Sequence, residues 1–122
     1  MRSTLTFLLA SAAMAGPAMA EPVFLVCRGW DYGLEGNIQF TVELDTSREG
    51  AISWVSGQRY STYCDRENCT LSRPVGQPNN PDEQYSISRI DGVYHHLVIG
   101  EERMRSAARF EGQGCRVSDQ KF

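Results

Sequence analysis

The stretch at residues 38–45, which reads IQFTVELD, alternates strictly between apolar and polar side chains. Successive side chains of a β-strand point to opposite faces of a sheet, so the alternation predicts a strand buried on one face and solvated on the other. The predicted inner face consists of Ile38, Phe40, Val42 and Leu44. The stretch therefore favours a fold built from β-strands.

Further strands are predicted on both sides of this stretch. Turn residues delimit predicted strands at residues 23–27, 51–55 and 60–64, and residues 103–111 alternate again. The apolar and small side chains of that last segment are Met104, Ser106, Ala108 and Phe110. A short helix at residues 101–108 is the alternative there. Seven or eight closely spaced strands predict an all-β fold, a single small antiparallel barrel or sandwich in meander order.

Turn residues separate the predicted strands. Asp91-Gly92 predicts a two-residue hairpin of type I′, because both residues tolerate positive φ. Residues 47–50 and 56–59 are expected to connect strands, and residues 74–82, with three prolines, to form a long irregular loop. A bulge at Gly112 or Gly114 is expected to bring Cys115 onto the face of the preceding strand that carries Phe110.

Residues 1–20 have the composition of a secretory signal peptide. Arg2 is followed by an apolar run at residues 5–15, a Gly-Pro break, and the small-x-small sequence Ala18-Met19-Ala20. A buried N-terminal helix is the alternative. The signal predicts that residues 21–122 form one domain in the periplasm or outside the cell. No second long apolar run occurs, so we expect no transmembrane segment in the mature chain.

Four cysteines lie in the predicted mature chain, at positions 27, 64, 69 and 115. An even number of cysteines in a small exported domain predicts disulfides, here two. Of the three possible pairings we expect Cys64–Cys69, which closes a short charged loop, and Cys27–Cys115, which joins the first strand to the last. The long-range bridge stabilises by ~4 kcal/mol in the loop-entropy model. A four-thiolate zinc site is the rival, but it usually needs Cys-x-x-Cys pairs, and none occurs.

The charge balance argues against nucleic-acid binding. Without Arg2, 11 basic residues stand against 15 acidic ones. A protein that binds a phosphate backbone needs a positive face that releases counterions. A net charge of −4 instead favours a cationic partner.

No constellation in the sequence predicts an enzyme, a cofactor or a metal site. His95 and His96 are adjacent, so on a strand they point to opposite faces and cannot bind one metal together. We expect His95, which shares a face with Val93, Leu97 and Ile99, to be a partly buried, hydrogen-bonded imidazole. No Gly-x-Ser-x-Gly elbow for a nucleophilic serine is present.

Other charged and aromatic residues are predicted to have structural or surface roles. Asp31 and Glu35 are read as surface charges rather than as a glycosidase pair. The segment with Asp65, Glu67 and Asn68 lacks the spacing of a calcium loop. A basic stripe at positions 103, 105 and 109 is expected to form cross-strand ion pairs with Glu101, Glu102 and Glu111. The remaining aromatics, assigned to the core or its rim, are Trp30, Trp54 and Tyr60.

Two segments resemble known families. The sequence at residues 87–92, with Gly114-Cys115 and a terminal Lys121-Phe122, is similar to small exported bacterial β-proteins that are mostly uncharacterised. The segment Ser56-Gly57-Gln58-Arg59-Tyr60 resembles the Ser-Gly-x-x-Tyr motif of bacterial inhibitors of C-type lysozyme. That family's second motif, a Trp-Thr-Lys-Gly-like stretch, is absent, and the segment with Cys64 and Cys69 stands in its place.

The second resemblance implies a function and a site. Members of that inhibitor family are small exported barrels with a disulfide from an early strand to the C-terminal end, and their Ser-Gly loop enters the lysozyme cleft, where the serine meets the catalytic carboxylates. It implies that Ser56, Gly57, Arg59 and Tyr60 bind a cationic protein such as a C-type lysozyme. A plain hairpin turn is the alternative reading of these residues.

The expected function is therefore that of a protein-binding module, such as an inhibitor of lysozyme or another cell-wall hydrolase. The alternative is a carrier of a small hydrophobic ligand in the periplasm. A carrier predicts an apolar cavity in the barrel, lined by Phe40, Leu44, Leu97, Ala108 and Phe110.

Overall fold

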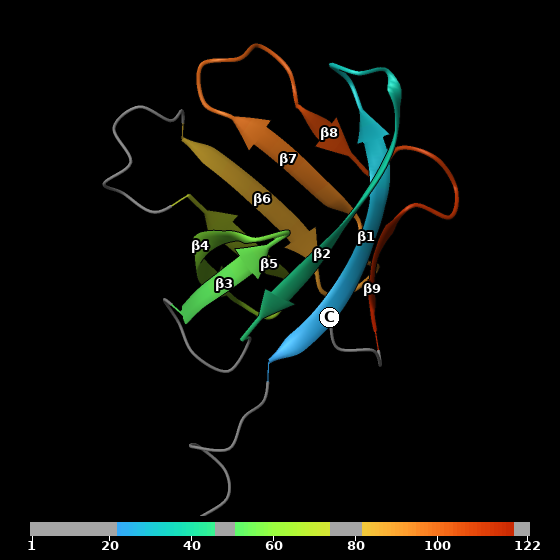
Figure 1. Ribbon diagram of the computed structural model, residues 1–122. Helices are drawn as coiled ribbons and strands as arrows, with labels where there is room; N and C mark the ends of the chain where they lie inside the picture. The colour runs from blue at the N-terminus through green and yellow to red at the C-terminus, as the bar shows by residue number, and fades with distance from the viewer. Residues whose placement is uncertain (1–21, 46–50, 74–81, 119–122) are drawn as a thin grey trace, which may run out of the picture.

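The computed structural model describes residues 22–45, 51–73 and 82–118, which form nine β-strands and no helix (Figure 1). The strands are β1 (Val23–Asp31), β2 (Gly36–Leu44), β3 (Ala51–Val55), β4 (Gln58–Cys64), β5 (Asn68–Ser72), β6 (Glu83–Ser88), β7 (Tyr94–Val98), β8 (Ser106–Ala107) and β9 (Gly114–Val117). The predicted signal peptide at residues 1–20, the turn at 47–50 and most of the loop at 74–82 lie outside the described residues. No helix in the described part of the chain is long and apolar enough to cross a membrane.

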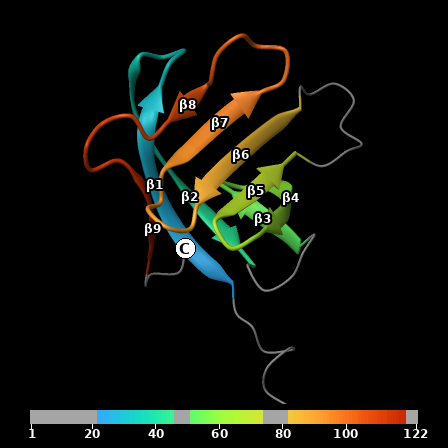
Figure 2. The ribbon, with the colours of Figure 1, turned by 180° about the vertical axis from the view of Figure 1, so that it is seen from behind.

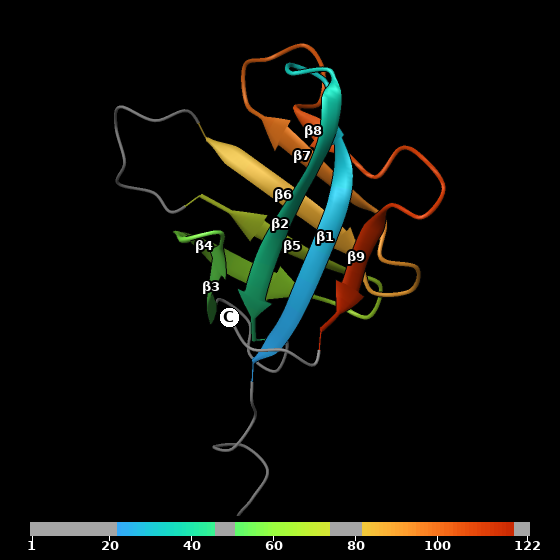
Figure 3. The same ribbon diagram turned by 45° about the vertical axis from the view of Figure 1, so that its right-hand side comes forward.

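The strands form a closed antiparallel barrel. Their order is β2-β3-β4-β5-β6-β7-β8-β1, and β1 pairs with β2 to close the ring of eight. The ninth strand, β9, pairs with β1 beside β8, and Figure 3 shows it next to β1. Seen from behind, the sheet runs through β5, β6 and β7 (Figure 2). The prediction of an all-β antiparallel meander is confirmed, and the architecture is the barrel rather than the sandwich.

The predicted strand at residues 38–45 lies within the long β1–β2 ribbon. Its register runs from Val23 opposite Leu44 to Asp31 opposite Gly36. Val42 and Leu44 are buried, and their polar neighbours Thr41 and Glu43 are not. The alternation therefore places one face of the ribbon on the core and leaves the other as part of the molecular surface.

Aromatic side chains fill the barrel. Tyr60, Tyr85 and Tyr94 are buried, and Phe40 packs against them with ring centroids 5.4 Å from Tyr85 and 5.1 Å from Tyr94. Gly29 is buried under Tyr94, and a Cβ at this position would come within 2.7 Å of ring atoms of that tyrosine. The absence of a side chain on β1 therefore makes room for a large one from β7.

Both predicted disulfides are present. Cys27–Cys115 joins β1 to β9, and Cys64–Cys69 closes the β4–β5 hairpin. All four cysteines are paired, so the zinc alternative is excluded for these thiols.

The predicted strand at residues 103–111 is wrong. Only Ser106 and Ala107 pair with neighbouring strands, and the chain then leaves the barrel wall at residues 108–113 before it returns as β9. Phe110 consequently lies outside the barrel, with 48% of its surface exposed. The helical alternative for residues 101–108 is wrong as well, and this six-residue excursion takes the place of the single bulge expected near Gly112.

Two turns differ from their predicted form. The β6–β7 connection is a five-residue loop at residues 89–93, in which Gly92 has positive φ (79°) but Asp91 does not, so it is no type I′ turn. A Cβ on Gly92 would collide with the backbone of Cys115. The β3–β4 connection is shorter than expected, because β4 begins at Gln58 and only Ser56 and Gly57 form the turn.

Candidate functional site

The Ser56–Gly57 turn is a tight, exposed hairpin tip. Both residues have positive φ, 44° and 95°, which is the backbone geometry of a type I′ turn. Ser56 is held to β2 by two hydrogen bonds: its N–H donates to the Thr41 carbonyl at 3.0 Å, and its Oγ accepts from the Thr41 N–H at 3.3 Å. Since Oγ accepts this bond, the serine hydroxyl keeps its own hydrogen for another acceptor.

An aromatic and a cationic side chain flank this tip. Trp54 and Arg59 are opposite each other on β3 and β4, and the guanidinium carbon lies 5.8 Å from the centre of the indole ring. Trp54 is 43% exposed. Together with Phe24 from β1, Trp54 and the turn line a shallow groove of about 160 Å³ on the outer face of the sheet. The tip is thus a preformed surface with one donor hydroxyl, one cation and exposed aromatic area.

Tyr60 does not belong to that surface. The side chains of Tyr60 and Thr62 point into the barrel, while those of Arg59, Ser61 and Tyr63 on the same strand point outward. The structure therefore brings Ser56, Gly57 and Arg59 together at the exposed tip and places Tyr60 in the core. Tyr60 can only position the strand that carries Arg59.

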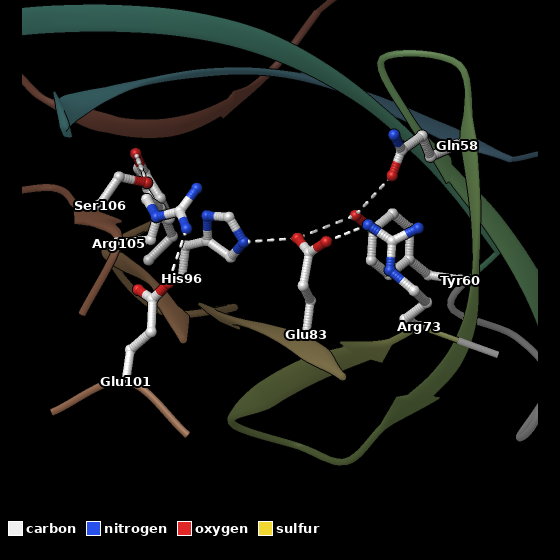
Figure 4. A network of polar contacts seen from close by, with 9 residues as sticks. Gln58, Tyr60, Arg73, Glu83, His96, Glu101, Arg105 and Ser106 are labelled. Carbon is white, nitrogen blue, oxygen red and sulfur yellow. Dashed lines mark hydrogen bonds and ion pairs between the residues drawn. The ribbon is translucent and has the colours of Figure 1, made fainter. Parts of the chain in front are cut away.

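A buried polar network lies beneath the same end of the barrel (Figure 4). The carboxylate of Glu83 on β6 forms an ion pair with Arg73 and a 2.8 Å contact with Nε2 of His96 on β7. The Tyr60 hydroxyl lies 3.5 Å from the same carboxylate, and the His96 ring stacks on Tyr85 with centroids 4.0 Å apart. The network links Tyr60 of β4, Glu83 of β6 and His96 of β7 to Arg73, which directly follows β5.

Burial and pairing set the protonation states of this network. Burial lowers the pKa of His96, and the adjacent Glu83 carboxylate offsets only part of that effect. Burial acts to raise the pKa of Glu83, but hydrogen bonds from Arg73 and His96 hold it below its ordinary value. The pair at neutral pH is therefore a neutral imidazole and an ionised carboxylate. Because a carboxylate only accepts hydrogen bonds, Nε2 of His96 carries the hydrogen.

The predicted buried histidine is the wrong one of the two. His96 is buried and hydrogen-bonded, and His95 is exposed on the outer face of β7. Apolar residues of both parities surround the pair in the sequence: Val93, Leu97 and Ile99 on one side, Tyr94 and Val98 on the other. The large side chain of Tyr94 lies inside the barrel, so His96 points inward with it and His95 points outward.

The acidic residues considered for a glycosidase pair or a calcium site lie in turns or next to them. Asp31 ends β1, and its Oδ1 accepts the Leu34 N–H at 2.8 Å within the β1–β2 turn, where Glu35 is exposed. Backbone N–H groups of Asn68 and Glu67 donate to Asp65 and lower the pKa of its carboxyl. Among the described residues no three His, Cys, Asp or Glu side chains gather into a group that could hold a metal ion.

The predicted basic stripe with cross-strand ion pairs is wrong. Arg103 and Arg105 lie in the β7–β8 connection, and Arg105 pairs with Glu101 in the same connection at 2.8 Å. Arg109 follows β8, with its guanidinium 5.6 Å from the Tyr32 ring and 5.0 Å from the Phe110 ring. The reason is that the segment leaves the sheet, so its alternation does not correspond to strand faces.

The cavity expected for a carrier is not formed by the predicted residues. Leu97 and Phe110 are exposed at 38% and 48%, and Phe40 packs among the tyrosines that fill the interior. A mainly apolar pocket of about 260 Å³ does open at the other end of the barrel, where β1 begins and β2 ends. Of the residues predicted to line the cavity, Leu44 lines this pocket. The other residues that line it include Val23, Leu25, Ile87 and Val117.

A second, larger groove was missed by reasoning from the sequence. It has a volume of about 640 Å³ and lies between the β1–β2 ribbon and the excursion at residues 108–113. Its lining includes Arg28, Trp30, Asn37, Gln39, Phe110 and Gln113. Residues so distant in sequence are brought together only by barrel closure. The one sequence feature that indicates the groove is the pair of glycines at positions 112 and 114. They flank Gln113 and interrupt the apparent strand.

Comparison with protein-family models, with curated proteins and with solved structures gave no match for this chain. We therefore infer its function from its own residues alone.

Proposed function

We propose that this protein is a protein-binding module that uses the tip of the β3–β4 hairpin, and that its target is a cell-wall hydrolase of the C-type lysozyme class. The observation that carries the proposal is the Ser56–Gly57 turn. It is exposed, and the two hydrogen bonds to Thr41 hold it to β2. A preformed tip loses little conformational entropy on binding, which favours affinity.

The chemistry of the tip suits a cleft that contains carboxylates. The Ser56 hydroxyl accepts from Thr41 and so is left to donate its hydrogen, and a hydrogen bond to an ionised carboxylate is stronger than one between neutral groups. Trp54 and Arg59 beside it are of the residue types that most often anchor protein interfaces. The acidic balance of the whole chain would favour encounter with a cationic enzyme.

Inhibition assays with Ser56 variants test this proposal. The purified protein should inhibit lysis of bacterial cell walls by a C-type lysozyme, and Ser56→Gly should weaken inhibition by about tenfold or more through loss of the hydroxyl hydrogen bond. Glycine is the sharper substitution because it accepts the positive φ without strain and keeps the N–H bond to the Thr41 carbonyl. Loss of the Oγ acceptor for the Thr41 N–H should lower the free energy of unfolding by only about 1 kcal/mol, so the variant should stay folded.

Two further variants complete that experiment. Ser56→Ala removes the same hydroxyl and should show the same loss. Ser86→Ala, on the outer face of β6, removes a serine hydroxyl elsewhere and should inhibit like the parent protein. Unimpaired lysis at micromolar parent protein, or full inhibition by Ser56→Gly, would contradict the proposal.

Carriage of a small hydrophobic ligand is a second candidate, because of the pocket at the end of the barrel where β1 begins. A ligand that binds only the folded state raises the midpoint of thermal unfolding. Decanoate should raise that midpoint, and acetate, which has the same charge without the chain, should not. Equal effects of the two anions would argue against the pocket as a ligand site.

A further inference from the structure

The excursion at residues 108–113 is an irregularity that the barrel does not need. β8 pairs with Trp30 and Asp31, and β9 pairs with Leu25 to Arg28, so the two could be one continuous strand along β1. Instead the chain leaves the wall opposite Gly29: the Ala108 N–H still donates to the Tyr94 carbonyl on β7, but residues 108–113 have no partner residue on β1. Such departures from a regular sheet concentrate at functional sites.

The excursion is built rather than loose. The Gln113 side-chain oxygen accepts the N–H groups of Arg109 and Phe110, both at 2.9 Å, and its amide nitrogen donates to Asn37 on β2 at 3.0 Å. Gly112 and Gly114 supply positive φ, 87° and 129°. These contacts fix the loop to the outer face of the β1–β2 ribbon and so define one wall of the groove.

Two aromatic rings form a corner in this groove. Trp30 from β1 and Phe110 from the excursion meet edge to face, with centroids 5.3 Å apart and planes at 90°. The Arg109 guanidinium lies 5.0 Å from the Phe110 ring. Phe110 nevertheless remains 48% exposed. The faces of aromatic rings are electron-rich, so they attract the weakly positive C–H groups that line one side of a sugar ring.

Planar hydrogen-bonding groups surround that corner. Arg28 Nε donates to the Gln39 side-chain oxygen at 3.1 Å, and Gln113 donates to the Asn37 side-chain oxygen. In both pairs the acceptor is the side-chain amide oxygen, of Gln39 in one and of Asn37 in the other. The amide N–H₂ groups of these two residues can therefore donate to hydroxyl oxygens of a ligand. The set is that of a site with aromatic area and a few oriented polar groups.

The charge of the groove selects the class of ligand. Arg28 and Glu111 contribute one charge of each sign to its lining. A single-stranded nucleic acid would need a positive track for its phosphates, and a free anion or cation would need an excess of one sign. A neutral, polyhydroxylated ligand matches both the rings and the amides.

From these observations we infer that the groove between β1–β2 and residues 108–113 binds a neutral oligosaccharide, with Trp30 and Phe110 against the sugar rings and Asn37, Gln39 and Arg28 on their hydroxyl groups. The volume of about 640 Å³ falls within the roughly 300–1,000 Å³ of small-molecule sites and is open at the surface, as a chain of sugars requires. This inference does not rest on the inhibitor proposal, since Ser56 and Gly57 line a different groove.

Titration of the full-length protein with defined sugars tests the inference. The probes are tri-N-acetylchitotriose, cellotriose and maltotriose, up to about 10 mM, because single-site sugar affinities of this kind are weak. The chain has two tryptophans, so in Trp54→Phe all indole fluorescence comes from Trp30. At least one of the three should change that fluorescence saturably, and calorimetry on the parent protein should give the same dissociation constant.

Substitutions of Phe110 separate an aromatic contact from mere bulk. Phe110→Leu keeps an apolar side chain of similar size without a ring and should weaken sugar binding by about fivefold or more, whereas Phe110→Tyr should retain it. Asn37→Ala should weaken binding as well. Ser56→Gly should bind the sugar like the parent, which keeps this test independent of lysozyme inhibition.

The contrary results are equally defined. No saturable response to any of the three sugars at about 10 mM, or equal affinity in Phe110→Leu and the parent, would overturn the inference. Loss of lysozyme inhibition in Phe110→Leu without any sugar response would assign the groove to a protein partner instead.

Discussion

At the scale of single residues, Gly29 shows how the interior depends on a missing side chain. Gly29→Ala would drive a methyl group into the ring of buried Tyr94 and should lower the free energy of unfolding by about 1–3 kcal/mol, as overpacking does. Gly36→Ala is the matched control, because a Cβ there meets no atom closer than 4.0 Å. Urea denaturation measures both, and equal effects would contradict the packing argument.

The His96–Glu83 pair predicts how stability depends on pH. The pKa of His96 is lower in the folded state than its ordinary value of 6.5, so the unfolded chain binds protons first and stability falls as pH drops below that value. The pKa of Glu83 is also lowered, so a further loss follows as pH falls below its ordinary value of 4.5. Thermal unfolding from pH 7.5 to 4 should show the two losses.

Two histidine variants assign the first loss. His96→Gln retains an N–H donor for Glu83 but cannot take up a proton, so the decline beginning near pH 6.5 should disappear. His95→Gln, on the exposed face of the same strand, should retain the decline of the parent. If both variants declined alike, the buried imidazole would not be the responsible group.

At the scale of elements, the two disulfides should differ in what they contribute. Cys27 and Cys115 are 88 residues apart and Cys64 and Cys69 only 5. Loop entropy then predicts losses of about 4–5 kcal/mol for Cys27→Ser with Cys115→Ser, and about 2 kcal/mol for Cys64→Ser with Cys69→Ser. Urea denaturation of the two double variants checks the order, and a reversed order would be inconsistent with it.

The excursion at residues 108–113 should depend on one side chain. Gln113→Ala removes both acceptor contacts to the loop backbone and the donor contact to Asn37. We expect faster hydrogen exchange at the Arg109 and Phe110 amides and a loss of about 1–2 kcal/mol in unfolding free energy. The amide of Cys115, which donates to Gly92 across the loop end, should exchange as in the parent.

The elements that were predictable are those in which one local pattern leads to one structure. Residues 38–45 alternate and lie on a strand of the core, and the cysteine spacing led to the observed disulfides. Residues 103–111 alternate as well, but Gln113 and two glycines hold that region out of the sheet. Alternation is necessary for a half-buried strand and does not by itself prove one.

The candidate sites divide in the same way. The Ser56–Gly57 turn is formed by neighbouring residues, so the local sequence predicts it. The inward direction of the Tyr60 side chain depends on where β4 begins, at Gln58. The groove brings together Trp30 and Phe110, which are 80 residues apart in the chain. No local sequence pattern predicts a contact between residues so far apart. The choice between His95 and His96 needed the same tertiary information, because apolar residues occur at both parities.

At the scale of the whole molecule, the excess of acidic residues predicts how the proposed association with a cationic hydrolase would respond to salt. Steering by opposite net charges is screened beyond about 10 Å at 0.1 M salt, so the association rate should fall by about tenfold between low and high ionic strength. The dissociation rate, which in the proposed complex depends on contacts at the hairpin tip, should change much less. Stopped-flow or surface-based kinetics would check this, and a salt-independent association rate would contradict it.

The pairing of β1 with β2 on one side and with β8 and β9 on the other also has a consequence for how the barrel closes. β8 and β9 at residues 106–117 must be available before β1 acquires its second neighbour, so the ring cannot close without them. A fragment truncated before Ser106 would leave the free margins of β1 and β7 available to other copies. The fold is therefore completed by contacts between segments at opposite ends of the described chain rather than between neighbours in sequence.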